Sequence, residues 1–322
     1  MPSFKFLDLP AELRSLIIEN VLFDRCQPPT KPSKTNRTIF RDIPYNAWRC
    51  RAYYQEQQHN TQGPSNSLSL LLTSRQISSE TQAILHLNPT DYHLDISMLN
   101  EVDIFPTWLS VPRLTPCIST LTASVRLFGH IISPQNVASQ VGDGGHLGFQ
   151  WSFYAVLERF LAYGPVAQKT PNNNKSTHPS QNNPNPSSMD RGITIKTLIL
   201  DFSSATDKTD PDLTFPPPEI DYTLWRIRHT SRRHPLLLRA GVDLMEHKPR
   251  PEFVAKYLTQ YIAGLLSMNY HTASYGRMLY ERIGAIRVLV DGRVYREFDL
   301  AEELAELRRR SYMICHRLSR LS

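Results

Sequence analysis

A glycine-rich run from Gly142 to Gly148 is the first part of the sequence whose residue types could bind a ligand, because glycine backbones can wrap a phosphate. A dinucleotide-binding loop needs a glycine where Leu147 stands, and a nucleoside-triphosphate loop needs Gly-Lys followed by Ser or Thr. Residues 132–140, which precede the run, also lack the alternation of a strand. The sequence therefore predicts a plain loop and no bound cofactor.

A second group combines the histidine and aspartate side chains that ligate metal ions: His86, Asp91, His93 and Asp95. They straddle a predicted helix–strand junction and lack two histidines four residues apart on one helix, so we predict no metal site. The four cysteines, at positions 26, 50, 117 and 315, form no C-x-x-C pair, which is typical of a reducing compartment. Because no nucleophile motif such as G-x-S-x-G is present either, the sequence predicts no catalytic residues and no enzyme.

Two basic stretches, residues 225–234 and 308–320, raise the alternative of a nucleic-acid-associated protein. The first interleaves arginine and histidine with Trp225, a mixture that phosphates and bases accept. Two nearby acids, Glu219 and Asp221, partly offset its charge, and no nucleic-acid-binding motif accompanies it. We therefore favour a solvated helix face and keep nucleic-acid binding as the less favoured alternative.

The composition is that of a globular protein, with 322 residues, of which 40% are hydrophobic and 20% are charged. No apolar run approaches the roughly 20 residues that span a bilayer. Lys5 and Asp8 interrupt the apolar start, unlike in a signal peptide. The sequence thus predicts a cytoplasmic or nuclear protein without a membrane partner.

Residue periodicity predicts the elements that position these side chains. Alternating, β-branched residues predict strands at 90–96, 118–128 and 193–202. Two apolar runs around Asp291-Gly292 predict a β-hairpin over 286–298. Helical spacing predicts helices at 105–109, 151–163, 252–268 and 300–321, the last with Asp299 as its N-cap.

Two apolar helices are predicted ahead of these elements. The first opens at Pro10, because proline fits the first helical turn, and repeats apolar residues at Leu13, Ile17 and Val21. The second covers residues 67–85. The predicted fold class is therefore α+β, with this N-terminal helical pair packed against a mixed domain of several β-strands and helices.

The chain divides into a helical region at 1–88 and an α+β domain at 89–322. A polar, proline-bearing segment at about 24–66 carries seven arginine and lysine residues against three acidic ones, and we predict a disordered insertion there. The asparagine- and proline-rich segment at about 166–191 predicts a disordered loop in the second domain.

The opening Leu9-Pro10-x-Glu12-Leu13-Arg14 and the later Ser74-Arg75-Gln76-Ile77-x-x-Glu80 together resemble the F-box-like proteins of filamentous fungi. Many of those combine an L-P-x-E-L-R opening with a C-R-Q-I-x-x-E segment, in which cysteine stands at the position of Ser74. In F-box proteins this module binds the Skp-type adaptor of a cullin–RING (SCF-type) ubiquitin ligase, and a downstream domain captures a protein substrate.

The resemblance implies a non-enzymatic substrate-recognition subunit whose adaptor-binding residues are Leu9, Pro10, Leu13 and Ile17. An apolar helix stripe near a chain end is a common way to bind a partner. The alternative is a structural or scaffold protein in which both helices are internal core, because amphipathic stripes usually pack inside. Solvent exposure of Leu9, Leu13 and Ile17 separates these two hypotheses.

Overall fold

The computed structural model describes residues 5–39, 51–55, 65, 67–99, 103–128, 149–165, 190–204, 251–270 and 272–318. Within these residues the chain forms a six-stranded mixed sheet, a two-stranded sheet and seven α-helices. The α+β class predicted from the sequence is thereby confirmed. The glycine-rich run at 142–148 and the basic stretch at 225–234 lie outside the described residues.

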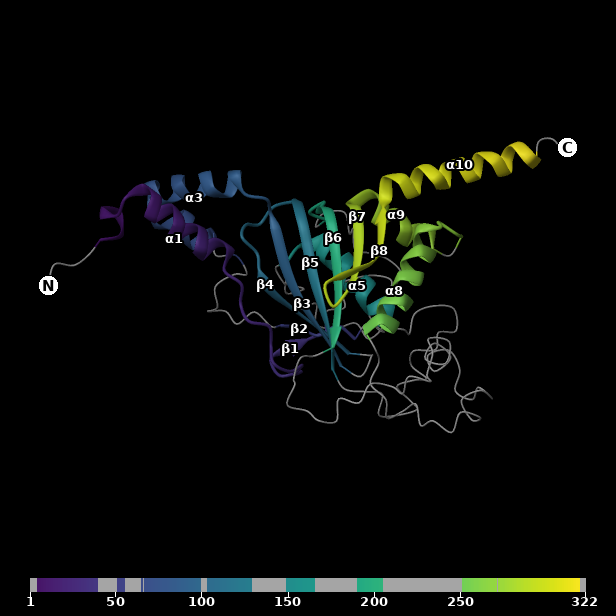
Figure 1. Ribbon diagram of the computed structural model, residues 1–322, viewed down its shortest axis with the longest axis horizontal. Helices are drawn as coiled ribbons and strands as arrows, with labels where there is room; N and C mark the ends of the chain where they lie inside the picture. The colour runs from purple at the N-terminus through teal and green to yellow at the C-terminus, as the bar shows by residue number, and fades with distance from the viewer. Residues whose placement is uncertain are drawn as a thin grey trace, which may run out of the picture.

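The six-stranded sheet has the order β4-β3-β5-β6-β7-β8 (Figure 1). Its four central strands run parallel: β3 (Asp91–Leu99), β5 (Cys117–Phe128), β6 (Thr194–Ser204) and β7 (Ile283–Val290). The edge strands β4 (Asp103–Ser110) and β8 (Arg293–Asp299) pair antiparallel with β3 and β7. A separate pair joins β1 (Arg37–Thr38) to β2 (Tyr54–Gln55). The three predicted strands and the predicted hairpin are confirmed.

Three helices cover one face of the sheet: α5 (Phe149–Tyr163), α8 (Pro251–Leu266) and α9 (Ala273–Arg282) (Figure 1). The main hydrophobic core lies between them and the strands, and its largest fully buried side chains include Tyr92, Phe202 and Phe298. Helix α10 (Leu300–Leu318) follows β8 and extends away from the sheet toward the C-terminus (Figure 1). Its predicted N-cap is confirmed, because the Asp299 carboxylate accepts hydrogen bonds from two backbone amides of the first turn.

The helical region lies at the opposite end of the sheet from α8 to α10 (Figure 1). It consists of a short 3-10 helix η1 (Phe6–Asp8) and the helices α1 (Ala11–Phe23), α2 (Ser67–Thr73) and α3 (Arg75–Leu87). These elements have a small hydrophobic cluster of their own, separate from the main core. The structure thus has one large core under the sheet and one small core between helices.

Two predicted helices are wrong in extent or type. The single helix at 67–85 is broken at Ser74, whose extended backbone and side chain cap α3 by accepting a hydrogen bond from the Ile77 amide (3.2 Å). Serine prefers this capping role to a helix interior. The helix at 105–109 is instead part of β4, where Phe105 is buried against the sheet and Pro106 is tolerated because β4 is an edge strand.

Residues 24–39, here named the strap, lead from α1 to the sheet face opposite to α5, α8 and α9. They belong to the segment predicted as a disordered insertion, of which residues 40–50, 56–64 and 66 lie outside the described residues. Its contacts with the sheet include the Lys34–Asp103 ion pair (2.9 Å), a hydrogen bond from Arg126 to the carbonyl oxygen of Pro29 (2.7 Å), and one from Arg37 to the carbonyl oxygen of Pro106 (2.9 Å). Basic side chains of the strap therefore make contacts within the molecule.

Candidate functional site

Helix α1 is apolar on two sides, and one of them is covered by α3. The covered side places Arg14, Ile18 and Leu22 one turn apart. Ile18 and Leu22 are each 1% exposed and share the small hydrophobic cluster with Ile77 and Ile84 of α3. The buried residues of α3 all lie on the side that faces this cluster. The contact therefore buries the apolar side of α3 but only one of the two apolar sides of α1.

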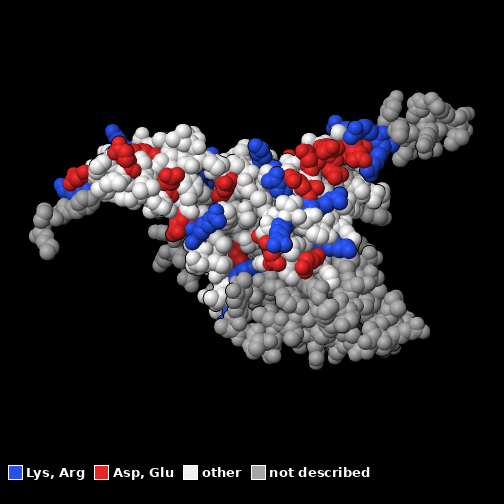
Figure 2. All heavy atoms as spheres, in the orientation of Figure 1, with Lys and Arg blue, Asp and Glu red and all other residues white. Residues whose placement is uncertain are grey.

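The uncovered side of α1 carries Leu13, Leu16, Ile17 and Val21, which we name the exposed stripe. Each of these side chains is 42–55% exposed. A helix with apolar residues around most of its circumference is normally buried on all sides. On the face shown in Figure 2, acidic side chains lie among uncharged ones over α1 and α3. The stripe is therefore the strongest indication of a second partner for α1.

The four predicted adaptor-binding residues lie together at the start of α1. Pro10, Leu13 and Ile17 are exposed, and Leu9 is half-buried. Pro10 is the N-cap of α1, and its carbonyl oxygen accepts hydrogen bonds from the amides of Leu13 and Arg14 (3.1 Å each). Leu13 and Ile17 do not belong to either hydrophobic core of the described residues. The exposure of Leu13 and Ile17 is what the adaptor hypothesis requires, whereas Leu9 meets this requirement only in part.

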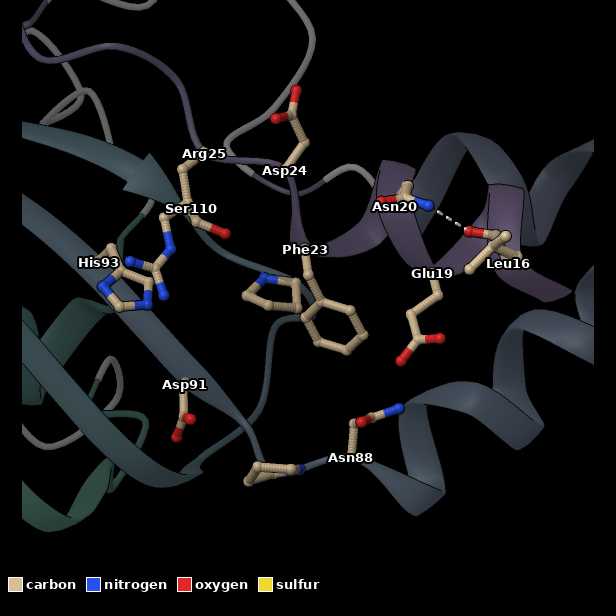
Figure 3. A pocket seen from close by; sticks show the side chains of 12 residues that line it. Leu16, Glu19, Asn20, Phe23, Asp24, Arg25, Asn88, Asp91, His93 and Ser110 are labelled. Carbon is tan, nitrogen blue, oxygen red and sulfur yellow. Dashed lines mark hydrogen bonds between the residues drawn. The ribbon is translucent and has the colours of Figure 1, made fainter.

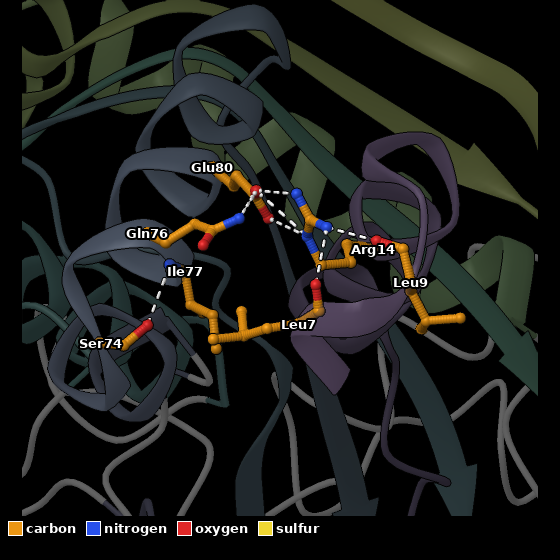
Figure 4. Close-up of polar contacts among 7 residues, drawn as sticks. All are labelled: Leu7, Leu9, Arg14, Ser74, Gln76, Ile77 and Glu80. Carbon is orange, nitrogen blue, oxygen red and sulfur yellow. Dashed lines mark hydrogen bonds and ion pairs between the residues drawn. The ribbon is translucent and has the colours of Figure 1, made fainter. Parts of the chain in front are cut away.

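Arg14 and Glu80, the last residues of the two motif segments, are joined across the helices (Figure 4). The Arg14 guanidinium donates to both carboxylate oxygens of Glu80, with a shortest distance of 2.6 Å, and also to the carbonyl oxygens of Leu7 and Leu9. Gln76 donates a further hydrogen bond to Glu80 (3.2 Å). The hydrogen bond from Arg14 is the main reason that the pKa of Glu80 lies below its ordinary value.

The sequence interpretation missed this pair. Both residues belong to the quoted motifs, but they lie 66 positions apart, and no local pattern indicates a contact over that separation. The signal for such a pair was Arg14 itself, which shares a helix face with apolar residues. An arginine on an apolar face indicates a partner, because arginine is almost never fully buried unless it is paired.

A hollow of about 590 Å³ lies beside the exposed stripe, where α1 meets the edge of the sheet (Figure 3). Leu16 belongs both to the stripe and to the lining of the hollow. Glu19 and Asp91 line it on opposite sides of the Phe23 ring (Figure 3). The hollow thus extends the uncovered surface of α1 toward the sheet and adds carboxylates to an apolar surface.

The four histidine and aspartate residues considered as metal ligands do not lie together in the structure. His86 is exposed on α3, Asp91 and His93 line the hollow from β3, and Asp95 is fully buried further along that strand. Burial is the main reason that the pKa of His93 lies below its ordinary value, so its imidazole is neutral at neutral pH. Among the described residues, no group of three or more His, Cys, Asp or Glu side chains is arranged to hold a metal ion.

The described part of the second basic stretch lies on α10. Acidic side chains gather at the start of this helix and basic ones follow, as Figure 2 shows. Arg310 forms an ion pair with Glu306 one turn earlier. The charge order matches the helix dipole, which favours acids near the N-terminus and bases toward the C-terminus. These residues therefore have a structural explanation that needs no nucleic acid.

Comparisons with known proteins find no relative: no protein-family model, curated protein or solved structure matches this chain. None of the described helices is both long and apolar enough to cross a membrane. The function is therefore inferred from the geometry of α1 and its surroundings.

Proposed function

We propose that the chain is an F-box-like substrate-recognition subunit of a cullin–RING ubiquitin ligase, in which α1 binds a Skp-type adaptor. The α+β domain then captures a protein substrate. In this role the chain performs no bond chemistry itself, since other subunits of such a ligase carry out ubiquitin transfer. The role also places the protein in the cytoplasm or the nucleus.

The observation that carries this proposal is the exposed stripe of α1. A large apolar side chain that stays half exposed to water forgoes several tenths to a few kcal/mol of burial free energy. Four such side chains next to one another form a patch of the kind that marks protein interfaces. The stripe begins within the L-P-x-E-L-R opening, and its Leu13 and Ile17 are among the residues that the resemblance assigns to the adaptor.

The scaffold alternative fits this geometry less well. If the two N-terminal helices were internal core, Leu13 and Ile17 would be covered by the sheet domain or by α3. Instead they are 47% and 42% exposed, and the contact between α1 and α3 uses Ile18 and Leu22. The observed packing leaves the predicted adaptor side of α1 free for a partner.

The direct test measures binding of the full-length chain to a purified Skp-type adaptor by calorimetry. Replacing two anchors at once, Leu13→Ala/Ile17→Ala, should weaken binding about 30-fold or more, because central apolar anchors carry most of an interface's free energy. The control is Val294→Ala, which removes a still more exposed apolar side chain (64%) from β8 at the far edge of the sheet. Val294→Ala should bind like the wild type.

Two results would overturn the proposal. One is the absence of binding between the wild-type chain and the adaptor at micromolar concentrations. The other is an equal loss of affinity in Val294→Ala and in the double variant, which would indicate nonspecific apolar association. Circular dichroism of each variant checks that the helices remain folded.

A further inference from the structure

The Arg14 side chain makes two sets of contacts at once. Its Nε and Nη2 atoms face the Glu80 carboxylate, whereas Nη1 donates to the carbonyl oxygens of Leu7 and Leu9 ahead of α1 (Figure 4). The guanidinium is a planar fork with five donors, so one side chain can bind a carboxylate and still reach a backbone. Arg14 therefore connects three pieces of chain: α1, α3 and the residues before α1.

Residues 5–10, here named the lead, have few other means of staying in place. The 3-10 helix η1 within the lead has three residues, none of them buried, and is closed by the amide hydrogen bonds of Asp8 and Leu9 (3.0 and 3.3 Å). Such short 3-10 turns have poor hydrogen-bond geometry and little stability of their own. Phe6 packs partly against the small hydrophobic cluster. The contacts of Arg14 are the second anchor of the lead.

The anchor point on α3 is itself well held. Glu80 lies between Ile77 and Ile84, whose side chains are buried in the small hydrophobic cluster, and Gln76 donates a hydrogen bond to its carboxylate. The side chain of Arg14 is 10% exposed and that of Glu80 is 20% exposed, so water reaches this pair only in part. A fixed carboxylate thus sets where the guanidinium lies, and the guanidinium sets where the carbonyl oxygens of the lead lie.

We propose that Arg14 and Glu80 form a positioning clamp, which holds the lead so that Leu9 and Pro10 share one surface with Leu13 and Ile17. The inference rests on the proposed function and names the residues that assemble its binding surface. The clamp is not needed for α1 to pack on α3, because Ile18 and Leu22 bury that contact. Arg14 is accordingly a positioning residue, and it acts on the partner through Leu9 and Pro10.

The first test uses Arg14→Lys and needs no adaptor. Lysine keeps the charge that Glu80 attracts, but its single ammonium cannot also span to the Leu7 and Leu9 carbonyl oxygens. Residue-resolved hydrogen exchange should show the Asp8 and Leu9 amides exchanging about tenfold faster in this variant. The Ile18 and Leu22 amides should keep their wild-type rates. Unchanged exchange at Leu9, or equal acceleration at Ile18 and Leu22, would overturn the clamp.

The second test is a double-mutant cycle on adaptor affinity. Arg14→Lys alone should weaken binding about tenfold. Combined with Leu9→Ala it should lose most of its further effect, because Leu9 is one of the two residues, with Pro10, through which Arg14 acts. Combined with Ile17→Ala, its full effect should remain. Additive losses with Leu9→Ala would mean that Arg14 acts through general stability and would overturn the positioning role.

The two tests fail separately. If the wild-type chain does not bind the adaptor, the proposed function is overturned, while the exchange rates still decide whether Arg14 holds the lead. If the adaptor binds and the exchange rates at Asp8 and Leu9 do not respond to Arg14→Lys, the proposed function stands and the clamp is overturned.

Discussion

Two of the arginine–carboxylate pairs of this molecule differ in burial and in what they join. Arg126 binds Asp95 with two hydrogen bonds (2.5 and 2.9 Å) between neighbouring parallel strands. Arg14 binds Glu80 between two helices. Each arginine also reaches a backbone carbonyl oxygen of an adjoining segment, Pro29 of the strap in the first pair and the lead in the second.

The surroundings of the carboxylates differ more than the contacts do. The Asp95 side chain is 1% exposed and accepts a further hydrogen bond from Ser97 (3.0 Å), whereas the Glu80 side chain is 20% exposed. A fully buried charge depends on its partner, because water cannot replace the lost hydrogen bonds. The same pairing at a partly wet site contributes little net stability and mainly fixes geometry. One pair thus secures the sheet domain, and the other arranges a surface.

Breaking the buried pair should have the largest effect. Arg126→Ala leaves the Asp95 carboxylate buried without its main partner, so we expect a loss of about 3–5 kcal/mol in the free energy of unfolding. Urea unfolding followed by tryptophan fluorescence measures it. Replacing both partners, Arg126→Met/Asp95→Leu, should recover most of the loss, because no charge is then stranded. A double variant as unstable as Arg126→Ala would contradict this account.

Leu22→Ala tests whether packing, and not the Arg14–Glu80 pair, holds α1 on α3. Leu22 is 1% exposed in a small cluster near the surface, where neighbours can relax, so we expect a loss of about 2–3 kcal/mol. The adjacent Val21→Ala is the matched control, since Val21 is on the exposed stripe and its loss should stay within about 0.5 kcal/mol. Hydrogen exchange of the α1 amides measures the loss of stability in each of the two variants. Similar losses in the two variants would mean that the exposed stripe is also a packing surface.

The Ser74 cap tests how firmly α3 presents Glu80. Ser74→Ala removes the side-chain oxygen that accepts from the Ile77 amide and should cost about 1 kcal/mol. Ser74→Asp should keep the cap, because aspartate accepts at the same position and suits the helix dipole. Thermal unfolding of both variants and exchange of the first-turn amides of α3 compare them. Equal stability of Ser74→Ala and Ser74→Asp would argue against the cap.

The sequence predicted the sheet domain better than the helical region because strand signals are local. The alternation of residues in β3, β5 and β6 indicates directly which side of each strand is buried. At the hairpin turn, Asp291 and Gly292 adopt the positive φ angles (48° and 75°) that such a turn needs. The helix break at Ser74 was missed, because the apolar stripe continues across it while the capping preference acts on a single residue.

The contacts that position the candidate residues could not be predicted from the sequence. Leu13 and Ile17 were identified from spacing and resemblance, but spacing alone does not tell which of two apolar sides of a helix meets the rest of the chain. Ile18 and Leu22 take that role here. The Arg14–Glu80 pair is a contact between distant segments, and such pairing follows from tertiary structure only.

Acid should loosen the Arg14–Glu80 pair, and this is the smallest of the expected effects. Hydrogen bonding from Arg14 lowers the pKa of Glu80 below its ordinary 4.5 in the folded chain. The contribution of Glu80 to stability is therefore complete above pH 4.5 and is lost as the pH falls through the lower folded value. Exchange protection of the Asp8 and Leu9 amides should fall in that window, and Glu80→Gln should remove the pH dependence. A wild-type profile that matches Glu80→Gln would show that the pair does not hold the lead.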